Sequence, residues 1–178
     1  MTSGMLPDPA SDPWMNPPHS LHIVIPFIPP TSNHIYVTIW ARKQIAKSKE
    51  ANAFHSRFMS EVVPVYLPWI SRMSNAPETI YRVSTYFYLD QWDVLNKGWF
   101  QTPKKAQTRY KKMDTGNRLK LIHDCLSDAL GVDDSHFFSL AANKAPAQEY
   151  GIEPSVHLYV EALPAPKDPV GTQTLMSV

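Results

Sequence analysis

The chain has little of what a disulfide framework, a zinc site or a membrane span requires. Cys125 is its one cysteine, which excludes an internal disulfide and a cysteine-rich zinc site. The apolar run at residues 21–28 contains Pro26 and is about eight residues long, whereas a helix needs roughly 20 to cross a bilayer. The opening residues show no secretion-signal pattern. We therefore expect a protein of the reducing cytoplasm, with no membrane partner.

Glycine-rich phosphate loops and an overall basic charge are missing as well. Gly131 and Gly151 stand alone, so no nucleotide-binding loop motif is present. Lysine and arginine number 17 against 16 aspartates and glutamates, which gives a net charge of +1. Taken as a single number, this charge argues against a generic basic coat for nucleic acid or anionic membrane.

Proline marks the two ends of the chain. Of 17 prolines, five lie in residues 1–19 and three in the last 16 residues. Segments of this kind do not join a helix or a sheet for long. A length of 178 residues suits one domain. We therefore predict a single folded domain at residues 20–163, between a Pro-rich N-terminal tail at 1–19 and a C-terminal tail at 164–178.

Hydrophobic periodicity predicts strands and helices in alternation within that domain. Ser48 is a plausible helix N-cap, and apolar residues recur at helical spacing from Ala51 until Pro64, which we expect to stop the helix. A second helix is predicted at residues 115–130, after an irregular basic segment at 96–113. Strands are predicted at residues 21–28, 34–40, 80–90, 136–144 and 155–162. This order predicts an α+β (mixed α/β) fold, a small mixed sheet with two main helices.

The near-zero net charge conceals a segregated pattern. Residues 94–120 contain eight lysines and arginines against one acid, a net +7, which leaves −6 for the rest of the chain. Trp99, Phe100 and Tyr110 lie among these bases. Basic and aromatic residues together offer phosphate contacts and surfaces for base stacking. On charge alone, a solvated loop whose lysines keep it soluble explains the segment equally well.

Acidic residues follow the basic segment and flank the second helix. Asp114 stands directly before the helix, and Asp133 and Asp134 come just after it. Converging carboxylates bind hard cations such as Mg2+, and a nearby lysine, here Lys120, offsets phosphate charge. Taken singly, Asp114 is better explained as a helix N-cap, and the later pair as a polar turn. Their combination downstream of the basic segment favours a site.

Two ordered stretches resemble a known family, the RusA-like Holliday junction resolvases of bacteria and their phages. The first is IPPTSNHIY (28–36), a strand with a Pro-Pro turn and an aromatic follow-up. The second is KKMDTGNRLKLIHDCLSDALGVDDSHF (111–137), in which basic residues, an acidic motif, a lysine, an Asp-Ala-Leu helix end and an Asp-Asp turn recur in the order of the family. The resemblance covers residues 21–162, with insecure alignment around 89–108.

The resemblance implies a dimeric, Mg2+-dependent endonuclease that cuts four-way DNA junctions in recombination or repair, in a bacterial or phage-infected cell. Mn2+ would be a substitute ion. The matched catalytic positions are Asp114, Lys120 and Asp134, and the metal ligands are Asp114, Asp134 and Asp133. The matched and neighbouring DNA contacts are Lys104, Lys105, Arg109, Lys111, Lys112, Asn117 and Arg118.

One position departs from the family pattern. Gly116 stands where the second aspartate of the Asp-x-Asp motif is expected, and glycine brings no ligand. Losing one carboxylate weakens an Mg2+ site. Three explanations stay open: a junction-binding protein that does not cut, an enzyme with a substitute ligand such as Asp124 or Asp128, or an inactivating substitution.

Two further residues of the second helix have simpler interpretations. His123 lies one turn beyond Lys120 and would face the same site, but an ordinary helix histidine is the better interpretation. Cys125 falls among apolar neighbours, which predicts a buried thiol.

Overall fold

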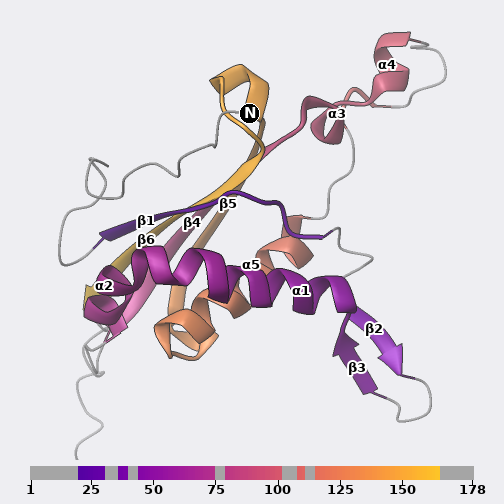
Figure 1. Cartoon of the computed structure of the whole chain (residues 1–178). Coiled ribbons are helices and arrows are strands. Elements are labelled where there is room, and N and C mark those ends of the chain that lie inside the picture. Colours follow the sequence, from indigo (N-terminus) through magenta and orange to yellow (C-terminus); the bar gives the residue numbers. More distant parts are fainter. Residues whose placement is uncertain are drawn as a thin grey trace, which may run out of the picture.

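A four-stranded mixed sheet with its longer helices gathered on one face forms the body of the molecule in the computed structural model (Figure 1). The structure describes residues 20–30, 36–39, 44–74, 79–101, 108–110 and 115–164. In the sheet, β1 (Ser20–Ile25) pairs antiparallel with β6 (Ser155–Pro164), and β6 pairs antiparallel with β4 (Thr79–Leu89). β4 pairs parallel with β5 (Phe137–Pro146) at the other edge. The predicted α+β class is confirmed.

Strand β4, predicted at residues 80–90, has the alternation of buried and exposed side chains expected of a strand covered on one face. Its odd-numbered positions from Thr79 to Leu89 are buried beneath the helices, and the even-numbered ones are partly or fully exposed on the opposite face. Successive strand side chains point to opposite faces, so a sheet covered on one side needs this pattern.

The first helix is longer than the sequence predicts. α1 (Lys49–Arg57) begins at the N-cap Ser48, whose Oγ accepts a hydrogen bond of 3.1 Å from the Ala51 amide, as expected. Pro64 does not end it. A π-helical turn, η4 (Phe58–Val62), leads straight into α2 (Val63–Ser74).

The π-turn explains why the prediction at Pro64 is wrong. The amide of Val63 donates to the carbonyl of Phe58, five residues back instead of four. A proline ring collides with the carbonyl four residues before it in a regular α-helix, and the wider turn relieves that crowding. The continuous helix carries one buried stripe against the sheet, made of Ala51, Phe54, Phe58, Val62, Tyr66 and Ile70.

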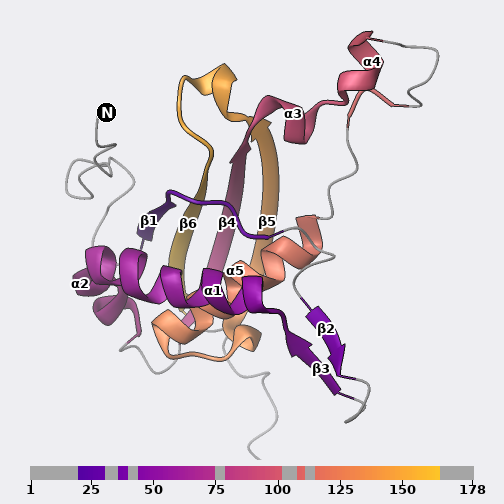
Figure 2. The same cartoon turned by 45° about the vertical axis from the view of Figure 1, so that its right-hand side comes forward.

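A small hairpin stands apart from the four-stranded sheet. β2 (Tyr36–Ile39) coincides with the predicted strand at 34–40, but it pairs with β3 (Gln44–Lys47), which the sequence analysis missed. The two strands form a separate sheet that projects from the start of α1 (Figure 2). Four residues per strand is too short for a clear periodicity signal.

Helix α5 (Thr115–Leu130) connects the two parallel strands and matches its predicted bounds. Parallel neighbours need a crossover of this kind, because no tight turn can join them. Leu121, Ile122, Cys125 and Leu126 are fully buried against the sheet and the long helix, so the buried thiol is confirmed. β5 begins at Phe137 opposite Tyr81, near the amino end of β4. The first turn of α5 therefore lies toward the carboxyl end of β4.

Among the described helices, none combines the length and apolar character that a membrane span requires.

Candidate nucleic-acid and metal site

The last turn of α5 is closed by a glycine cap that delivers the acidic pair. Gly131 adopts a left-handed φ of 67°, and the Val132 amide donates to the Ser127 carbonyl at 3.1 Å. This bond from the second residue after the helix to the last turn is the Schellman arrangement, which glycine favours at this position. Asp133 follows and caps η5 (Asp134–His136), where its Oδ1 accepts from the Ser135 amide at 2.9 Å.

The two acids of the pair differ in their surroundings. Hydrogen bonds from Ser135 lower the pKa of Asp133, which therefore acts as a cap for the short helix. Both acids are exposed, but Asp134 caps no helix and lies within electrostatic range of the buried His123 ring in the middle of α5. Asp134 is therefore the acid of this pair whose carboxylate is better placed to meet a cation from solution.

His123 is a buried histidine that packs inside the fold. Only 7% of it is exposed, its ring centroid lies 5.7 Å from that of Phe137, and its Nε2 has no hydrogen-bond partner. Burial lowers the pKa of His123 to about 4, against small opposing effects of Asp124 and Asp134. The ring is therefore neutral at pH 7, and the interpretation of His123 as an ordinary helix histidine fits its burial.

The residues proposed as substitute ligands already have partners. Asp124 pairs with Lys47 at 2.8 Å, and Asp128 pairs with His55 at 2.7 Å. Both contacts join α5 to β3 or α1. A metal ion would therefore have to displace Lys47 or His55 to recruit either carboxylate.

The structure places the described motif residues along the whole of α5. Gly116 is exposed in the first turn, Lys120 is exposed one turn later, and Asp134 follows the last turn. Sixteen helical residues span about 24 Å. The acid that precedes the helix in the chain and the pair that follows it are therefore attached to opposite ends of α5. Five predicted site residues, Asp114, Lys104, Lys105, Lys111 and Lys112, lie outside the described residues, and Asn117 is described only as part of the helix.

Within the described part of the chain, no three His, Cys, Asp or Glu side chains are grouped so that they could hold a metal ion. Asp134 supplies one hard oxygen donor. Mg2+ is commonly held by one or two carboxylates together with substrate phosphate and water, so this donor suits the ion without forming a complete cage.

Two short helices project from the sheet, one just before the predicted irregular basic segment at 96–113 and one within it. α3 (Gln91–Val94) is capped by Asp90, whose Oδ1 accepts from the Trp92 amide at 2.8 Å. α4 (Lys97–Gln101) follows, and the Asn96 amide donates to the Arg109 carbonyl at 2.9 Å, which ties the returning chain to this unit. We call residues 91–101 and 108–110 the aromatic arm.

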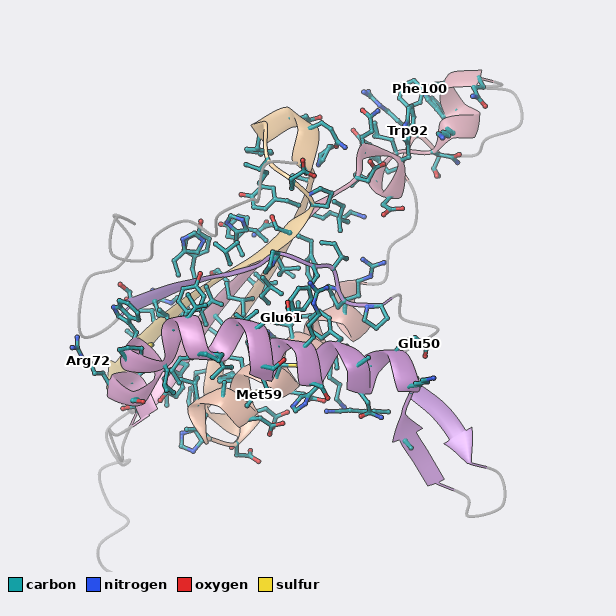
Figure 3. All side chains as sticks on the ribbon, viewed as in Figure 1. Glu50, Met59, Glu61, Arg72, Trp92 and Phe100 are labelled. Atoms are coloured by element: carbon teal, nitrogen blue, oxygen red, sulfur yellow. The ribbon has the colours of Figure 1, made fainter. Side chains whose placement is uncertain are left out.

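Cations and aromatic rings interleave in the aromatic arm. The Lys97 Nζ lies 5.1 Å from the centroid of Trp92, and the Arg109 Cζ lies 5.8 Å from Phe100 and 5.7 Å from Tyr110. The rings of Trp92 and Phe100 meet edge to face at 6.3 Å, away from the sheet (Figure 3). Phe100 and Tyr110 remain 50% and 57% exposed. The aromatic arm therefore exposes aromatic rings to solvent with positive charges beside them.

Trp92 escaped the sequence analysis because it lies outside the stretch of high positive charge. The signal that could have found the turn is Asp90 at the end of the strand, since an aspartate side chain commonly accepts from the amide two residues on, which here is that of Trp92.

Arg118 does not lie where a DNA-contacting surface residue would. It is 7% exposed, and its Nη1 has no hydrogen-bond partner. Burial lowers the pKa of Arg118, and the negative charge of Asp93 on α3 partly offsets this effect. Arg118 is therefore not the surface DNA contact that the sequence predicts. A ligand can bind it only by reaching a largely enclosed guanidinium.

Comparison of the chain with models of known protein families finds no match, and comparison with curated proteins finds none either. The resemblance to RusA-like resolvases thus rests on the residues at 28–36 and 111–137 and stays a prediction.

The neutral His123 makes stability depend on pH. A histidine in the unfolded chain titrates near pH 6.5, so on acidification the unfolded chain takes up this proton before the folded one does. The contribution is present above pH 6.5 and is lost as the pH falls toward 4. We expect His123→Gln to remove about 2 kcal/mol of the fall in unfolding free energy between pH 7.5 and 5, measured by urea titration. An unchanged pH dependence in the variant would contradict the burial of a neutral ring.

Proposed function

We propose that this chain is a RusA-like, structure-selective DNA endonuclease that resolves four-way junctions by Mg2+-dependent phosphodiester hydrolysis. The observation that carries the proposal is the position of the aromatic arm, which follows β4 at the same end of the sheet as the first turn of α5 (Figures 1 and 2). DNA held by the arm would lie beside the helix that bears the family motif.

Binding is the better-supported half of this function. Exposed rings with cations beside them stack on unpaired bases at a branch point, and the cations meet phosphates. The +7 of residues 94–120 supplies the electrostatic attraction. An isologous homodimer would present two equal surfaces to the two equivalent strands of a junction. We place this activity in the cytoplasm of a bacterial or phage-infected cell.

Catalysis is assigned by the resemblance together with the exposure of two motif residues. Bound Mg2+ would activate water and stabilise the charge that develops on phosphate. Asp134 offers an oxygen ligand after the last turn of α5, whereas Asp114, its matched partner in the family pattern, precedes the first turn of that helix in the chain. Lys120, exposed on the second turn of α5, would offset phosphate charge.

The alternative is a protein that binds junctions without cutting them. Gly116 favours it, because the first turn of α5 brings no carboxylate at this position. The absence of a grouped metal-binding set among the described residues is consistent with it. Binding through the aromatic arm is common to both candidates, whereas cleavage separates them.

Removing one exposed ring tests the binding surface. We expect Phe100→Ala to weaken junction binding by about 1–3 kcal/mol, the usual value of one base–aromatic stack. Fluorescence anisotropy with a labelled synthetic four-way junction measures the change. Phe138→Ala is the matched control, because Phe138 is 61% exposed but lies on β5. Equal losses in the two variants would refute the arm as the binding surface.

Removing the described metal ligand tests cleavage. Asp134→Asn keeps the size of the side chain and removes its charge, so we expect cleavage of the junction in Mg2+ to fall by about a hundredfold or more while binding is retained. Asp128→Asn is the control, since Asp128 pairs with His55 and should be dispensable for cutting. Persistent cleavage by Asp134→Asn would show that the metal assignment is wrong.

Restoring the missing carboxylate separates the two candidate functions. Gly116→Asp adds a ligand and Gly116→Asn adds only the side-chain volume, so we expect the aspartate variant alone to cut faster, by about tenfold or more. Cleavage by the parent chain eliminates the binding-only alternative. Cleavage by Gly116→Asp alone, with none by the parent, eliminates the proposed activity for this chain and identifies Gly116 as the disabling residue.

A further inference from the structure

Arg118 stands out because it is a buried cation with no ion-pair partner among the described residues. Among the described residues, it is the one lysine, arginine, aspartate or glutamate that is buried. Its Nη1 donates no hydrogen bond. Enclosing a guanidinium in this way costs several kcal/mol unless hydrogen bonds and opposite charge compensate.

Asp93 is the charge that could compensate, but it acts from a distance. The carboxylate of Asp93 attracts the guanidinium of Arg118 electrostatically. The two side chains form neither a hydrogen bond nor a close ion pair with each other. Desolvation outweighs this attraction, so the pKa of Arg118 falls below its ordinary value. The guanidinium therefore keeps hydrogen-bonding capacity for another anion.

The guanidinium belongs to the first turns of α5. Arg118 is the fourth residue of this 16-residue helix, and helix side chains lean toward the N-terminus, which brings its head level with the first turn. α3, which carries Asp93, lies beyond that end of α5 (Figure 2). The amides of a helix N-terminus and its dipole attract anions.

The same place is where sheets with parallel strands bind ligands. α5 begins toward the carboxyl end of β4, outside the parallel pair that β4 forms with β5. Ligands of open α/β sheets bind in this position. Gly116 in the first turn presents no side chain and no negative charge toward an approaching anion.

We propose that Arg118 and the first turn of α5 form a binding pocket for a phosphate group. The group is either a backbone phosphate of DNA held by the aromatic arm or a free phosphate ion. The DNA form rests on the proposed function, whereas the pocket itself does not. In this arrangement the glycine that weakens a metal site favours an anion site, because a carboxylate at position 116 would repel phosphate.

Binding of inorganic phosphate tests the pocket without DNA. Phosphate is titrated into the full-length chain at constant ionic strength, with chloride as the reference, and the melting temperature is recorded. A ligand that binds only the folded state raises this temperature in proportion to the logarithm of its concentration. We expect a phosphate-specific rise for the parent chain and its loss in Arg118→Met, which keeps the length of the side chain and removes its charge.

Asp93→Asn is the control that separates a pocket from a distant ion pair. If the role of Arg118 is only to attract Asp93, the Asp93→Asn variant should lose stability and gain no phosphate affinity. If Arg118 binds phosphate, loss of the competing carboxylate should preserve or increase the response. Equal phosphate responses in the parent chain and Arg118→Met would overturn the pocket.

Two further measurements protect the test against a misfolded variant and identify the source of the phosphate. In the parent chain, the Arg118 Nε–Hε resonance should shift during the phosphate titration, and an unmoved resonance would overturn the pocket. On junction DNA, Arg118→Met, which removes the charge, should weaken binding by about tenfold and lower the salt slope by about 0.9 if the pocket takes a backbone phosphate. A response to phosphate with unchanged junction binding assigns the pocket to free phosphate and refutes the DNA form.

Discussion

The burial of α5 between the sheet and the long helix is the constraint on which the placement of every motif residue depends. Its buried stripe packs against both elements and fixes the rotation of α5 about its axis and its position along that axis. The stripe consists of Leu121, Ile122, Cys125 and Leu126. At about 25 cal/mol per Å2 of apolar surface, each such large side chain contributes roughly 1.5–3 kcal/mol. With this stripe fixed, Lys120 must face solvent and Arg118 must face the interior. The chemistry of the helix follows from its packing.

Ion pairs at the rim of α5 hold the same arrangement. Lys47 and Asp124 join the hairpin strand β3 to α5, and burial and the carboxylate act in opposite directions on the lysine, with a net rise in the pKa of Lys47. His55 and Asp128 join α1 to α5 nearer its end. Partly exposed pairs of this kind are each worth roughly 1 kcal/mol or less, so they set orientation more than stability. They also use the two acids that would otherwise be free to supply a metal ligand.

The sequence predicts those parts of the fold in which local pattern and tertiary packing agree. The bounds of α5 and the alternation of β4 are of this kind, because a single buried face decides each. Pro64 misleads because a π-turn removes the collision on which the prediction depends, and this turn is visible only in three dimensions. Arg118 misleads because charge alone implies exposure, whereas its position on the buried side of α5 decides its environment. The candidate site is predictable in its residue types and only partly in its geometry.

The sign of the charge at the start of α5 decides which ligand that end of the helix binds. Two aspartates, one directly before the helix and one in its first turn, would make it a cation site, and phosphate would then bind through the metal. With Gly116 in place of one of them and Arg118 buried behind it, the local balance shifts toward positive charge, reinforced by the helix dipole. The net charge of +1 carries no information on this point, because the opposing charges occupy different elements. Whether a cation or an anion is bound there is therefore decided by two residues in the first turn of one helix, whose axial positions are fixed by the apolar stripe.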